Sequence, residues 1–370
     1  MLNSLHWRYL KMDKLSRRVF MKAGSAALGA ASIGWAAAVR SATASARPAP
    51  GYPAPQFVQT NGIRMGYYEK GSGLPIVFCH GFPELAYSWR YQIDAFAGAG
   101  YRVILPDQRG YGLTERPVDV SSYALAELCA DMAGLLDALT IDKAIFVGHD
   151  WGGGIVWMMP RMFPDRVAGV IGVNTPAFDP RPENQVDRPP SLIIPSERFY
   201  QRTFQEPGVA EAALSRDVRQ TFEFLMRKGG FWNVDEFKNL PEDSPERRMD
   251  LLTMLERGDF QGEMLLTEAE LNYYVSSFEA TGFAGGLNWY RAGLGADGAA
   301  LSWDIDVPCL YVGAEHDVIL PPSSSNGMER YIGDLEKYTV ADSGHWTQQE
   351  QPEVFNRVAL NWLERKFGRA

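Results

Sequence analysis

The chain has 370 residues, of which 46% are hydrophobic and 22% charged, so it is long enough to bury a core and unlike a disordered polypeptide. Its 36 Lys and Arg residues against 45 Asp and Glu residues give a net charge of -9, which argues against nucleic acid as a partner. Cys79, Cys129 and Cys309 are too few and too scattered for a disulfide framework or a cysteine-rich zinc site, and we expect buried free thiols.

The first 46 residues have the features of an export signal. They carry seven basic residues and one acid, whereas the rest of the chain carries 29 basic and 44 acidic residues. Residues 16–22 (SRRVFMK) resemble the twin-arginine motif, and residues 44–46 (ASA) have the small side chains of a signal-peptidase site. The apolar stretch between them, residues 23–39, is shorter than the roughly 20 residues of a membrane span. We therefore predict a periplasmic or secreted protein, exported by the transient action of the twin-arginine machinery, whose mature chain begins near Arg47. Met12 is an alternative start.

From residue 57 onward, short β-branched or aromatic runs alternate with longer amphipathic ones, which is typical of an α/β fold. Asn61-Gly62 predicts a hairpin between the first two strands, and an apolar stripe predicts a helix at residues 123–140. Strands that alternate with helices are expected to pair in parallel. The predicted strands of this part are residues 57–60, 64–69, 76–79, 102–106, 144–148 and 167–173.

The alternation stops between Asp179 and about residue 300. This region begins with several prolines, is rich in helix-favouring residues and has no convincing strand, so we expect a helical lid inserted into the α/β domain. Strands at 307–313 and 335–340 and a helix at 352–367 follow. The expected organisation is a signal at 1–46, an α/β core formed by 47–178 and 301–370, and a lid at 179–300.

Residues 144–154 (AIFVGHDWGGG) predict a sharp turn from a strand into a helix. Gly148 and Gly152 flank the central residue in the pattern Gly-x-nucleophile-x-Gly, where larger side chains would collide with neighbouring strands. The amides at the start of the following helix favour negative charge at that residue. A phosphate-binding loop is the alternative, but the glycine spacing differs and no Lys-Ser/Thr pair follows.

The residue in this turn is Asp150, which determines the expected reaction class. A carboxylate that attacks an ester gives a labile anhydride, whereas attack on a saturated carbon gives an ester that water can cleave at its carbonyl. The expected substrates therefore carry an electrophilic saturated carbon, as epoxides and alkyl halides do.

Four histidines remain after the signal: His80, His149, His316 and His345. His80 and His149 lie in turns next to the expected nucleophile, and we interpret them as structural residues beside the site. His345 follows the last predicted strand, and Asp317 follows the strand before it. The order Asp150, Asp317, His345 is the nucleophile, acid and histidine order of α/β-hydrolases. In this arrangement Asp317 orients the imidazole and His345 deprotonates water.

Residues 80–83 (HGFP) follow an early strand, where such folds supply an oxyanion donor. We expect the backbone amides of Phe82 and Trp151 to bind the oxygen that becomes negative when water attacks the Asp150 ester, each contributing about 10²- to 10³-fold in rate. A tight turn, with a cis bond before Pro83, is the structural alternative and is compatible with this role.

Four motifs over residues 57–363 give the chain a specific resemblance. Residues 80–84 (HGFPE), 107–112 (DQRGYG), 149–153 (HDWGG) and 344–348 (GHWTQ) resemble the epoxide hydrolases of the α/β-hydrolase family, most closely the soluble ones. Two lid segments, residues 199–211 and 286–291 (GLNWYR), are similar to the family's two tyrosine-bearing motifs. The resemblance implies an α/β-hydrolase fold, a mostly parallel sheet flanked by helices, that acts on a small epoxide and water.

Opening an epoxide leaves an alkoxide, which a phenol with a pKa near 10 can protonate. By motif position Tyr200 and Tyr290 are the expected donors, with Tyr273 and Tyr274 as nearby competitors. Trp151, Phe178 and Trp346 are expected to line an apolar pocket, although many aromatic residues simply belong to the core. The expected reaction requires no metal and no organic cofactor. No feature of the sequence specifies an oligomeric state.

Hydrolytic dehalogenation is the alternative reaction, because it uses the same three residues and Trp151 could bind a halide. Against it, Phe82 stands where haloalkane dehalogenases usually have Asn, and halide release needs no paired tyrosines. A hydrolase fold that only binds a ligand is poorly supported, since every position of the triad is filled.

Overall fold

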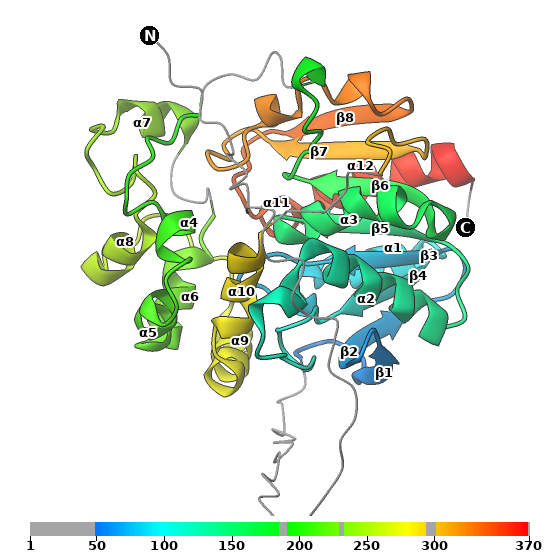
Figure 1. Ribbon diagram of the computed structural model, residues 1–370, viewed down its shortest axis with the longest axis horizontal. Helices are drawn as coiled ribbons and strands as arrows, with labels where there is room; N and C mark the ends of the chain where they lie inside the picture. Colours follow the sequence, from blue (N-terminus) through cyan, green and yellow to red (C-terminus); the bar gives the residue numbers. More distant parts are fainter. Residues whose placement is uncertain (1–48, 185–190, 229–232, 294–300, 369–370) are drawn as a thin grey trace, which may run out of the picture. The chain divides into compact units, whose positions relative to one another are not determined.

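The computed structural model describes residues 49–184, 191–228, 233–293 and 301–368. Within them, eight strands form one sheet in the order β1-β2-β4-β3-β5-β6-β7-β8 (Figure 1). The strands are β1 (Gln56–Thr60), β2 (Ile63–Lys70), β3 (Pro75–Cys79), β4 (Arg102–Pro106), β5 (Ala144–His149), β6 (Val167–Val173), β7 (Cys309–Ala314) and β8 (Leu335–Val340). Strand β2 pairs antiparallel with β1 and β4, and the remaining neighbours pair in parallel. The predicted α/β fold with a mostly parallel sheet is confirmed.

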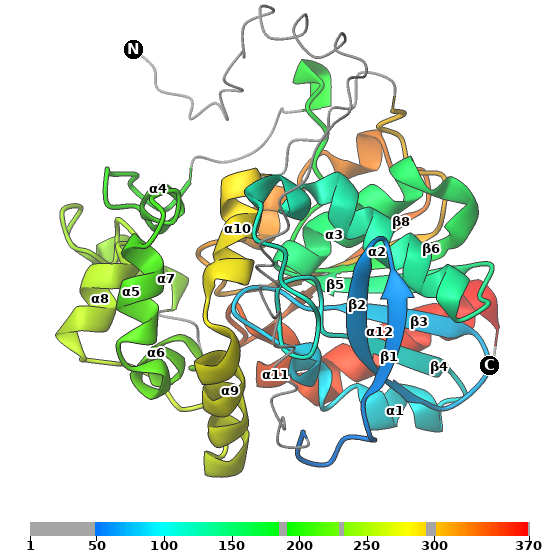
Figure 2. The same cartoon turned by 60° about the horizontal axis from the view of Figure 1, so that its bottom comes forward.

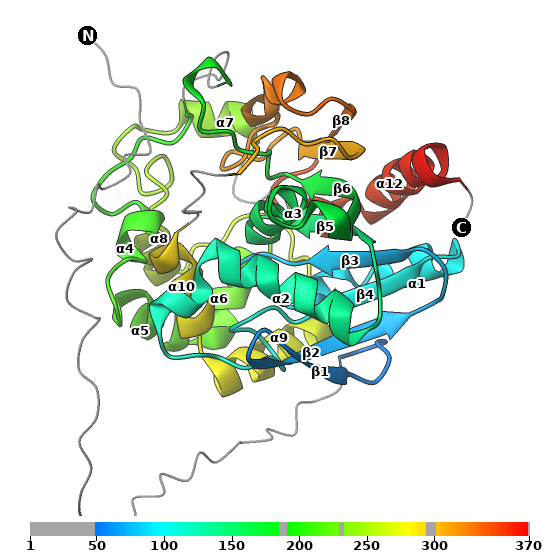
Figure 3. The ribbon, with the colours of Figure 1, turned by 45° about the vertical axis from the view of Figure 1, so that its right-hand side comes forward.

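Helices cover both faces of the sheet. Helices α2 (Leu125–Ala138) and α3 (Trp151–Met162) lie on one face, and α1 (Ile93–Gly98) and α12 (Pro352–Phe367) lie on the other (Figures 2 and 3). The central strand β5 is consequently buried along its whole length, which explains its continuous apolar run. The short helices that connect the core elements are η1 (Ala86–Trp89), η2 (Val120–Tyr123), η3 (Pro164–Arg166), η5 (Pro322–Ser325), η6 (Met328–Arg330) and α11 (Thr347–Glu350).

Between β6 and β7 the described residues form helices and no strand of the sheet, apart from two isolated bridges, Arg227 with Met264 and Ile305 with Ile332. These helices are η4 (Pro182–Asn184), α4 (Tyr200–Thr203), α5 (Val209–Ser215), α6 (Val218–Leu225), α7 (Val234–Asn239), α8 (Leu251–Arg257), α9 (Glu268–Thr281) and α10 (Ala284–Ala292). We call residues 179–300 the lid segment. It packs closely on the core: the Trp289 indole donates to the Arg109 carbonyl at 3.0 Å, and a Cβ at Gly285 would lie 2.3 Å from the Gly110 carbonyl oxygen.

Several strand ends differ from the sequence expectation by one residue, and three element boundaries differ by two, each for a local backbone reason. Helix α2 begins at Leu125 because Ala124 is extended, with ψ 146°, and residues 120–123 form the separate η2. It ends before Thr140, which has a left-handed φ of 55°. Strand β7 begins at Cys309, since Pro308 has no N–H to donate to the ladder. The hairpin at Asn61-Gly62 is confirmed, with φ values of 40° and 77° that this turn requires.

The described chain is tied into the core from its first residues. Ala49 is buried, and the Tyr52 hydroxyl donates to the Ala86 carbonyl at 2.9 Å. The predicted export signal lies outside the described residues. Among the helices of the described ranges, none combines the length and apolarity needed to cross a membrane. The three cysteines are buried free thiols, as predicted, and burial raises the pKa of each.

Candidate active site

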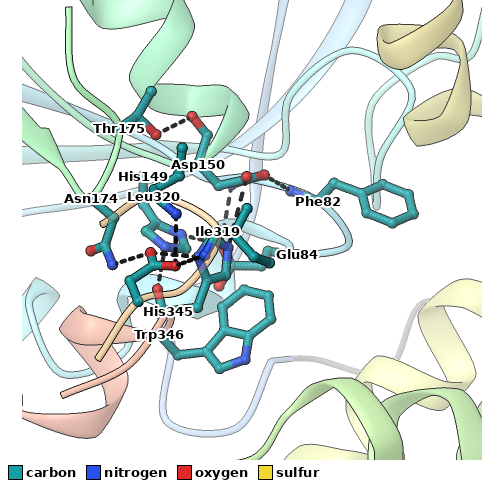
Figure 4. Close-up of polar contacts among 12 residues, drawn as sticks. Phe82, Glu84, His149, Asp150, Asn174, Thr175, Ile319, Leu320, His345 and Trp346 are labelled. Atoms are coloured by element: carbon teal, nitrogen blue, oxygen red, sulfur yellow. Dashed lines mark hydrogen bonds and ion pairs between the residues drawn. The ribbon is translucent and has the colours of Figure 1, made fainter. Parts of the chain in front are cut away.

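The predicted nucleophile, acid and histidine meet at one edge of the sheet. Asp150 follows β5, Asp317 follows β7 and His345 follows β8, and the carboxyl ends of these parallel strands lie side by side. Phe82, shortly after β3, comes to the same place (Figure 4). Parallel pairing therefore assembles four residues that are up to 263 positions apart in the sequence.

The turn that presents Asp150 is strained and closely packed. Asp150 has φ 52° and ψ -120°, a conformation that costs a non-glycine residue about 1–3 kcal/mol. A Cβ at Gly152 would lie 2.1 Å from the Cys79 carbonyl oxygen, and one at Gly148 would lie 2.3 Å from the Gly152 carbonyl oxygen. The Thr175 hydroxyl donates to the Asp150 carbonyl at 2.7 Å (Figure 4). The two glycines are thus required for the close packing that holds the carboxylate at the sheet edge.

His345 lies between the two carboxylates. Its Nδ1 is 2.9 Å from Asp317 Oδ2, and its Nε2 is 3.8 Å from Asp150 Oδ2. With Nδ1 bound to Asp317, the Nε2 atom faces the nucleophile and is the atom that can exchange a proton there.

Asp317 is kept ionised by several donors. The amides of Ile319 and Leu320 donate to its Oδ1 at 2.9 Å each, and the Asn174 amide donates to its Oδ2 at 2.7 Å. Burial raises the pKa of Asp317, but the charge and hydrogen bond of His345, together with these donors, outweigh it and lower the pKa to about 2. A carboxylate ionised throughout the physiological range can orient His345 and stabilise its imidazolium.

Asn174 is a member of the site that sequence reasoning missed. It directly follows β6, has a left-handed φ of 60°, and its side-chain oxygen accepts a hydrogen bond from the Thr347 hydroxyl at 2.7 Å. That bond fixes which way the amide points, so the NH₂ group faces Asp317. Its place after a buried parallel strand was the signal available in the sequence.

The environment of His345 favours its protonated form while Asp150 is ionised. Burial lowers the pKa of His345, but Asp317, and more weakly Asp150 and Glu84, overcome this and raise the pKa to about 9. The contribution of the Asp150 charge is the one that a covalent reaction at Asp150 would remove.

The Phe82 amide donates to Asp150 Oδ1 at 2.9 Å, at the position expected of an oxyanion donor. The Phe82-Pro83 peptide bond is cis. A Cβ at Gly81 would lie 2.4 Å from the Asp150 Cβ, so the absence of a side chain at Gly81 allows this approach. Trp151 is the first residue of α3, directly after Asp150, which is the position predicted for the second donor.

Tyr200 and Tyr290 come from different lid helices and lie close together. Tyr200 begins α4 and Tyr290 lies in α10, with ring centroids 6.0 Å apart. The Tyr290 ring packs edge-on against Trp151 and Phe82, at 4.9 and 5.3 Å. Burial, and next the charge of Asp150, raise the pKa of both hydroxyls, so both are protonated and near the nucleophile.

The direction of one hydrogen bond shows what the Tyr200 hydroxyl can do. The Gln201 amide donates to the Tyr200 oxygen at 3.1 Å. Because that oxygen is the acceptor in this bond, its own proton remains to be donated to another group.

The competing tyrosines have different surroundings. The Tyr273 hydroxyl shares a hydrogen bond with the Tyr68 hydroxyl at 3.2 Å, and its pKa is raised by burial and then by Asp107. Tyr274 packs on Phe222, and its pKa is raised by burial and then by Glu84. These contacts make Tyr273 and Tyr274 part of the packing between lid and core.

Of the predicted pocket aromatics, Trp346 and Trp151 lie beside the triad. The Trp346 ring packs on His345 at 4.9 Å, and its indole donates to the Leu225 carbonyl of the lid segment at 2.8 Å. Phe178 follows β6 and is half-buried, and its carbonyl accepts a hydrogen bond from Arg161 at 2.8 Å. Its role in the pocket stays a prediction.

A buried Glu84–His149 pair lies beneath the site. His149 Nδ1 is 3.0 Å from Glu84 Oε2, and His149 Nε2 is 2.7 Å from the His345 carbonyl oxygen (Figure 4). Burial raises the pKa of Glu84, but its bonds and charge interactions, chiefly with His149, lower it overall. Both ring nitrogens of His149 therefore lie within hydrogen-bond distance of an oxygen, and these two contacts fix the orientation of the ring. Sequence reasoning placed His149 beside the site but did not identify Glu84.

His80 has the structural role that was predicted. The Gln108 amide donates to His80 Nε2 at 3.1 Å, and His80 Nδ1 faces the Gly81 carbonyl at 3.0 Å. This pattern defines a neutral ring with its proton on Nδ1, and burial lowers the pKa of His80.

One group of potential metal ligands occurs among the described residues. Ligand atoms of Glu315, His316 and Asp342 lie within 4.8 Å of one another. Glu315 and Asp342 are exposed, and exposed acidic groups are common without an ion, so we assign this group no ligand.

Fold and site together define the class, an α/β hydrolase with a carboxylate in the nucleophile position. A family model described as the alpha/beta hydrolase fold matches residues 75–352. The chain is 38% identical over 323 residues to epoxide hydrolase A of Mycobacterium tuberculosis, covering 83% of this chain and 96% of that protein. The chain belongs to the epoxide hydrolases of the α/β hydrolase-fold family.

Other relatives agree. The chain is 40% identical over 321 residues to bifunctional epoxide hydrolase 2 of Mus musculus, covering 82% of this chain and 54% of the mouse protein. It thus spans about half the length of the bifunctional relatives it matches. Among solved structures, epoxide hydrolase A from Mycobacterium thermoresistibile has a TM-score of 0.67 and 32% identity, covering 84% of this chain and 98% of that one. An epoxide hydrolase from an endophytic Streptomyces has a TM-score of 0.69 and 31% identity, covering 84% and 95%.

Proposed function

We propose that this protein hydrolyses small, largely apolar epoxides to vicinal diols through an ester on Asp150. The observation that carries the proposal is the combination of a carboxylate in the nucleophile position with two buried, protonated tyrosines near it, Tyr200 and Tyr290. A carboxylate alone would serve an alkyl halide equally well, but a halide leaves without a proton. Family membership supports the same reaction, because the relatives above are named epoxide hydrolases.

In the first half-reaction Asp150 attacks one oxirane carbon. A C–O bond forms between Asp150 and that carbon, the oxirane C–O bond breaks, and the oxygen leaves with the electron pair. Tyr200 or Tyr290 donates its proton to this oxygen, which gives a hydroxy ester, and regains a proton from solvent. The tyrosines act as hydrogen-bond donors in the ground state because their raised pKa keeps them neutral.

In the second half-reaction water cleaves the ester. His345 Nε2 removes a proton from water, which attacks the carbonyl carbon of the Asp150 ester. The negative oxygen that results lies where the Phe82 amide already donates, and the Trp151 amide is the proposed second donor. Collapse releases the diol, whose second hydroxyl takes the proton from His345, and regenerates the Asp150 carboxylate.

Ester formation also prepares His345 as a base. The ionised Asp150 is one of the charges that raise the pKa of His345 to about 9. An ester carries no charge, so that contribution disappears and the pKa of His345 falls. A larger fraction of His345 is therefore neutral, and able to take a proton from water, in the intermediate than in the free enzyme.

A single turnover in ¹⁸O water tests this route. With enzyme in excess over a styrene-type epoxide, the label should enter Asp150 and leave the first diol unlabelled, because water attacks the ester carbonyl and not the epoxide. Labelled diol in the first turnover would exclude the ester route. A parallel panel of aryl, terpene and fatty-acid epoxides with haloalkanes separates the proposal from dehalogenation, which chloride or bromide release would indicate.

Replacing Tyr290 or Tyr200 by phenylalanine should slow ester formation by about 10²-fold each, since one preorganised donor to a developing negative charge is worth about this much. The rate of ester breakdown should change far less. Rapid quenching followed by intact-protein mass spectrometry measures both steps. Tyr273→Phe is the matched control, because its hydroxyl bonds Tyr68 away from Asp150. Equal slowing by Tyr273→Phe would contradict the assignment.

We also propose that residues 1–46 direct twin-arginine export to the periplasm or the medium. The mature protein would then consist of a core formed by 47–178 and 301–370, with the lid at 179–300. The burial of Ala49 supports a cleavage site before it, because the folded core then begins within a few residues of the predicted site. In a bacterium with this pathway, Arg17→Lys with Arg18→Lys should leave the protein in the cytoplasm. Export undiminished by that double change would reject the signal.

A further inference from the structure

A buried cation connects the lid segment to the core next to the active site. The Arg90 side chain, 5% exposed, forms an ion pair between its Nε and Glu270 Oε1 at 2.6 Å. It also donates to the Leu265 carbonyl at 3.3 Å and to Gln349 Oε1 at 2.6 Å. Arg90 follows η1 in the core, Leu265 and Glu270 belong to the lid segment, and Gln349 lies in α11. The Arg90 guanidinium thus connects its own segment of the core with the lid segment and with α11.

The Glu270 end of this connection is itself fixed. Glu270 is the third residue of α9, and its other carboxylate oxygen accepts the Thr267 amide at 2.7 Å in a capping box. Its side chain is only 11% exposed. The position of Arg90 is therefore coupled to the start of a lid helix by a pair from which water is largely excluded.

The Gln349 end leads to the catalytic histidine. Gln349 Nε2 donates to Glu84 Oε1 at 2.8 Å, and the other oxygen of Glu84 binds His149, whose second nitrogen binds the His345 carbonyl. The Gly81 amide also donates to Glu84, one residue before the Phe82 amide that binds Asp150. Displacing Gln349 would thus disturb the main chain at both His345 and Phe82. We call this line of contacts, which runs from Glu270 through Arg90, Gln349, Glu84 and His149 to His345, the network.

We infer that Arg90 is a positioning residue through which the seating of the lid on the core sets the geometry of His345 and the Phe82 amide. This inference rests on the proposed two-step reaction. It identifies the step most affected. His345 and the Phe82 amide both act in water attack on the ester, whereas in epoxide opening the Phe82 amide only binds the Asp150 carboxylate. The tyrosines that serve epoxide opening lie on α4 and α10, outside the network. Loosening the connection therefore slows ester breakdown more than ester formation.

The test breaks the network at two points. Glu270→Gln removes the charge that pairs with Arg90 but keeps an oxygen for the Thr267 amide, so the α9 cap is retained. Gln349→Met removes the bridge to Glu84 without leaving a buried charge unpaired. Ester formation and breakdown are measured separately, by rapid quench and intact-protein mass spectrometry with a styrene-type epoxide, on the full-length mature protein.

Asp131→Asn is the matched control. Asp131 forms a buried ion pair with Arg109 at 2.5 Å, with side chains 1% and 4% exposed, within the core and outside the network. This change should lower thermal stability as Glu270→Gln does but leave the ratio of the two rates unchanged. Comparison of the two variants separates a loss of stability from a loss of positioning.

We expect Glu270→Gln and Gln349→Met each to slow ester breakdown about 10-fold or more, the scale of a displacement well below 1 Å, with formation within about 2-fold of wild type. The double variant should be no slower than Gln349→Met alone, because both changes interrupt one connection. Equal slowing of both steps, or rate losses that multiply, would overturn the inference. A wild-type enzyme that never forms an ester would instead overturn the proposed reaction itself, and the inference with it.

Discussion

Asp150→Ala is expected to lower the turnover of epoxides by about 10⁶-fold, the scale observed when the nucleophile of a catalytic triad is removed. The tyrosines, His345 and the Phe82 amide remain, but without the Asp150 carboxylate the ester cannot form. The variant should also show no mass increase on incubation with epoxide. Steady-state diol formation and intact-protein mass spectrometry measure the two effects.

The strain of the turn remains in this variant, because alanine also carries a Cβ at a positive φ, and the hydrogen bond between the Phe82 amide and the carboxylate is lost. Asp94→Ala is the control for a lost carboxylate: Asp94 lies on the surface, 70% exposed and paired with Lys70, and its removal should leave turnover unchanged. Residual activity of Asp150→Ala above about 1% of wild type would show that water attacks the epoxide directly.

His345→Gln is expected to separate the two half-reactions. Asp150 and the tyrosines are untouched, so the ester should form, but glutamine cannot accept a proton from water and breakdown should slow by about 10⁴-fold. The enzyme should consume one equivalent of epoxide and gain its mass. Intact-protein mass spectrometry, followed by peptide mapping that locates the adduct on Asp150, is the measurement.

Asn174→Ala is expected to have a rate of ester breakdown between those of wild type and His345→Gln. It removes the donor to Asp317 while leaving the His345–Asp317 contact in place, so the ester should break down more slowly than in wild type yet much faster than in His345→Gln. An ester that forms and breaks down at wild-type rates in His345→Gln would remove the base role from His345.

The fold was predictable because its strands are short apolar runs separated by local turn signals. β4, β6 and β8 begin and end where the residue pattern indicates. The errors lie at element ends, where one φ value at Thr140 or one missing amide at Pro308 decides the boundary. The missing amide of Pro308 can be read from the sequence, whereas the backbone angle at Thr140 can be read only from the structure.

The triad was predictable for a related reason. Asp150 directly follows β5, and Asp317 and His345 lie three and five residues past the ends of β7 and β8. Parallel strands bring their carboxyl ends to one edge of the sheet. The elbow glycines add a steric requirement that can be recognised in eleven consecutive residues, 144–154. Chain order and local pattern were therefore enough to name three residues that the structure brings together at this edge.

The supporting contacts were not predictable in this way. Glu84, His149, His345 and Gln349 form one hydrogen-bonded line although they are spread over 265 positions, and Arg90 joins them to Glu270. A buried glutamate or arginine has no local sequence signal, because its cost of burial is met by partners that only the packed chain supplies. The sequence by itself determined the order along the chain of Asp150, Asp317 and His345, and that a carboxylate occupies the nucleophile position. Only the tertiary structure decided which buried polar groups hold the base in place and how the lid is fixed to them, since these depend on distances between segments and not on the segments themselves.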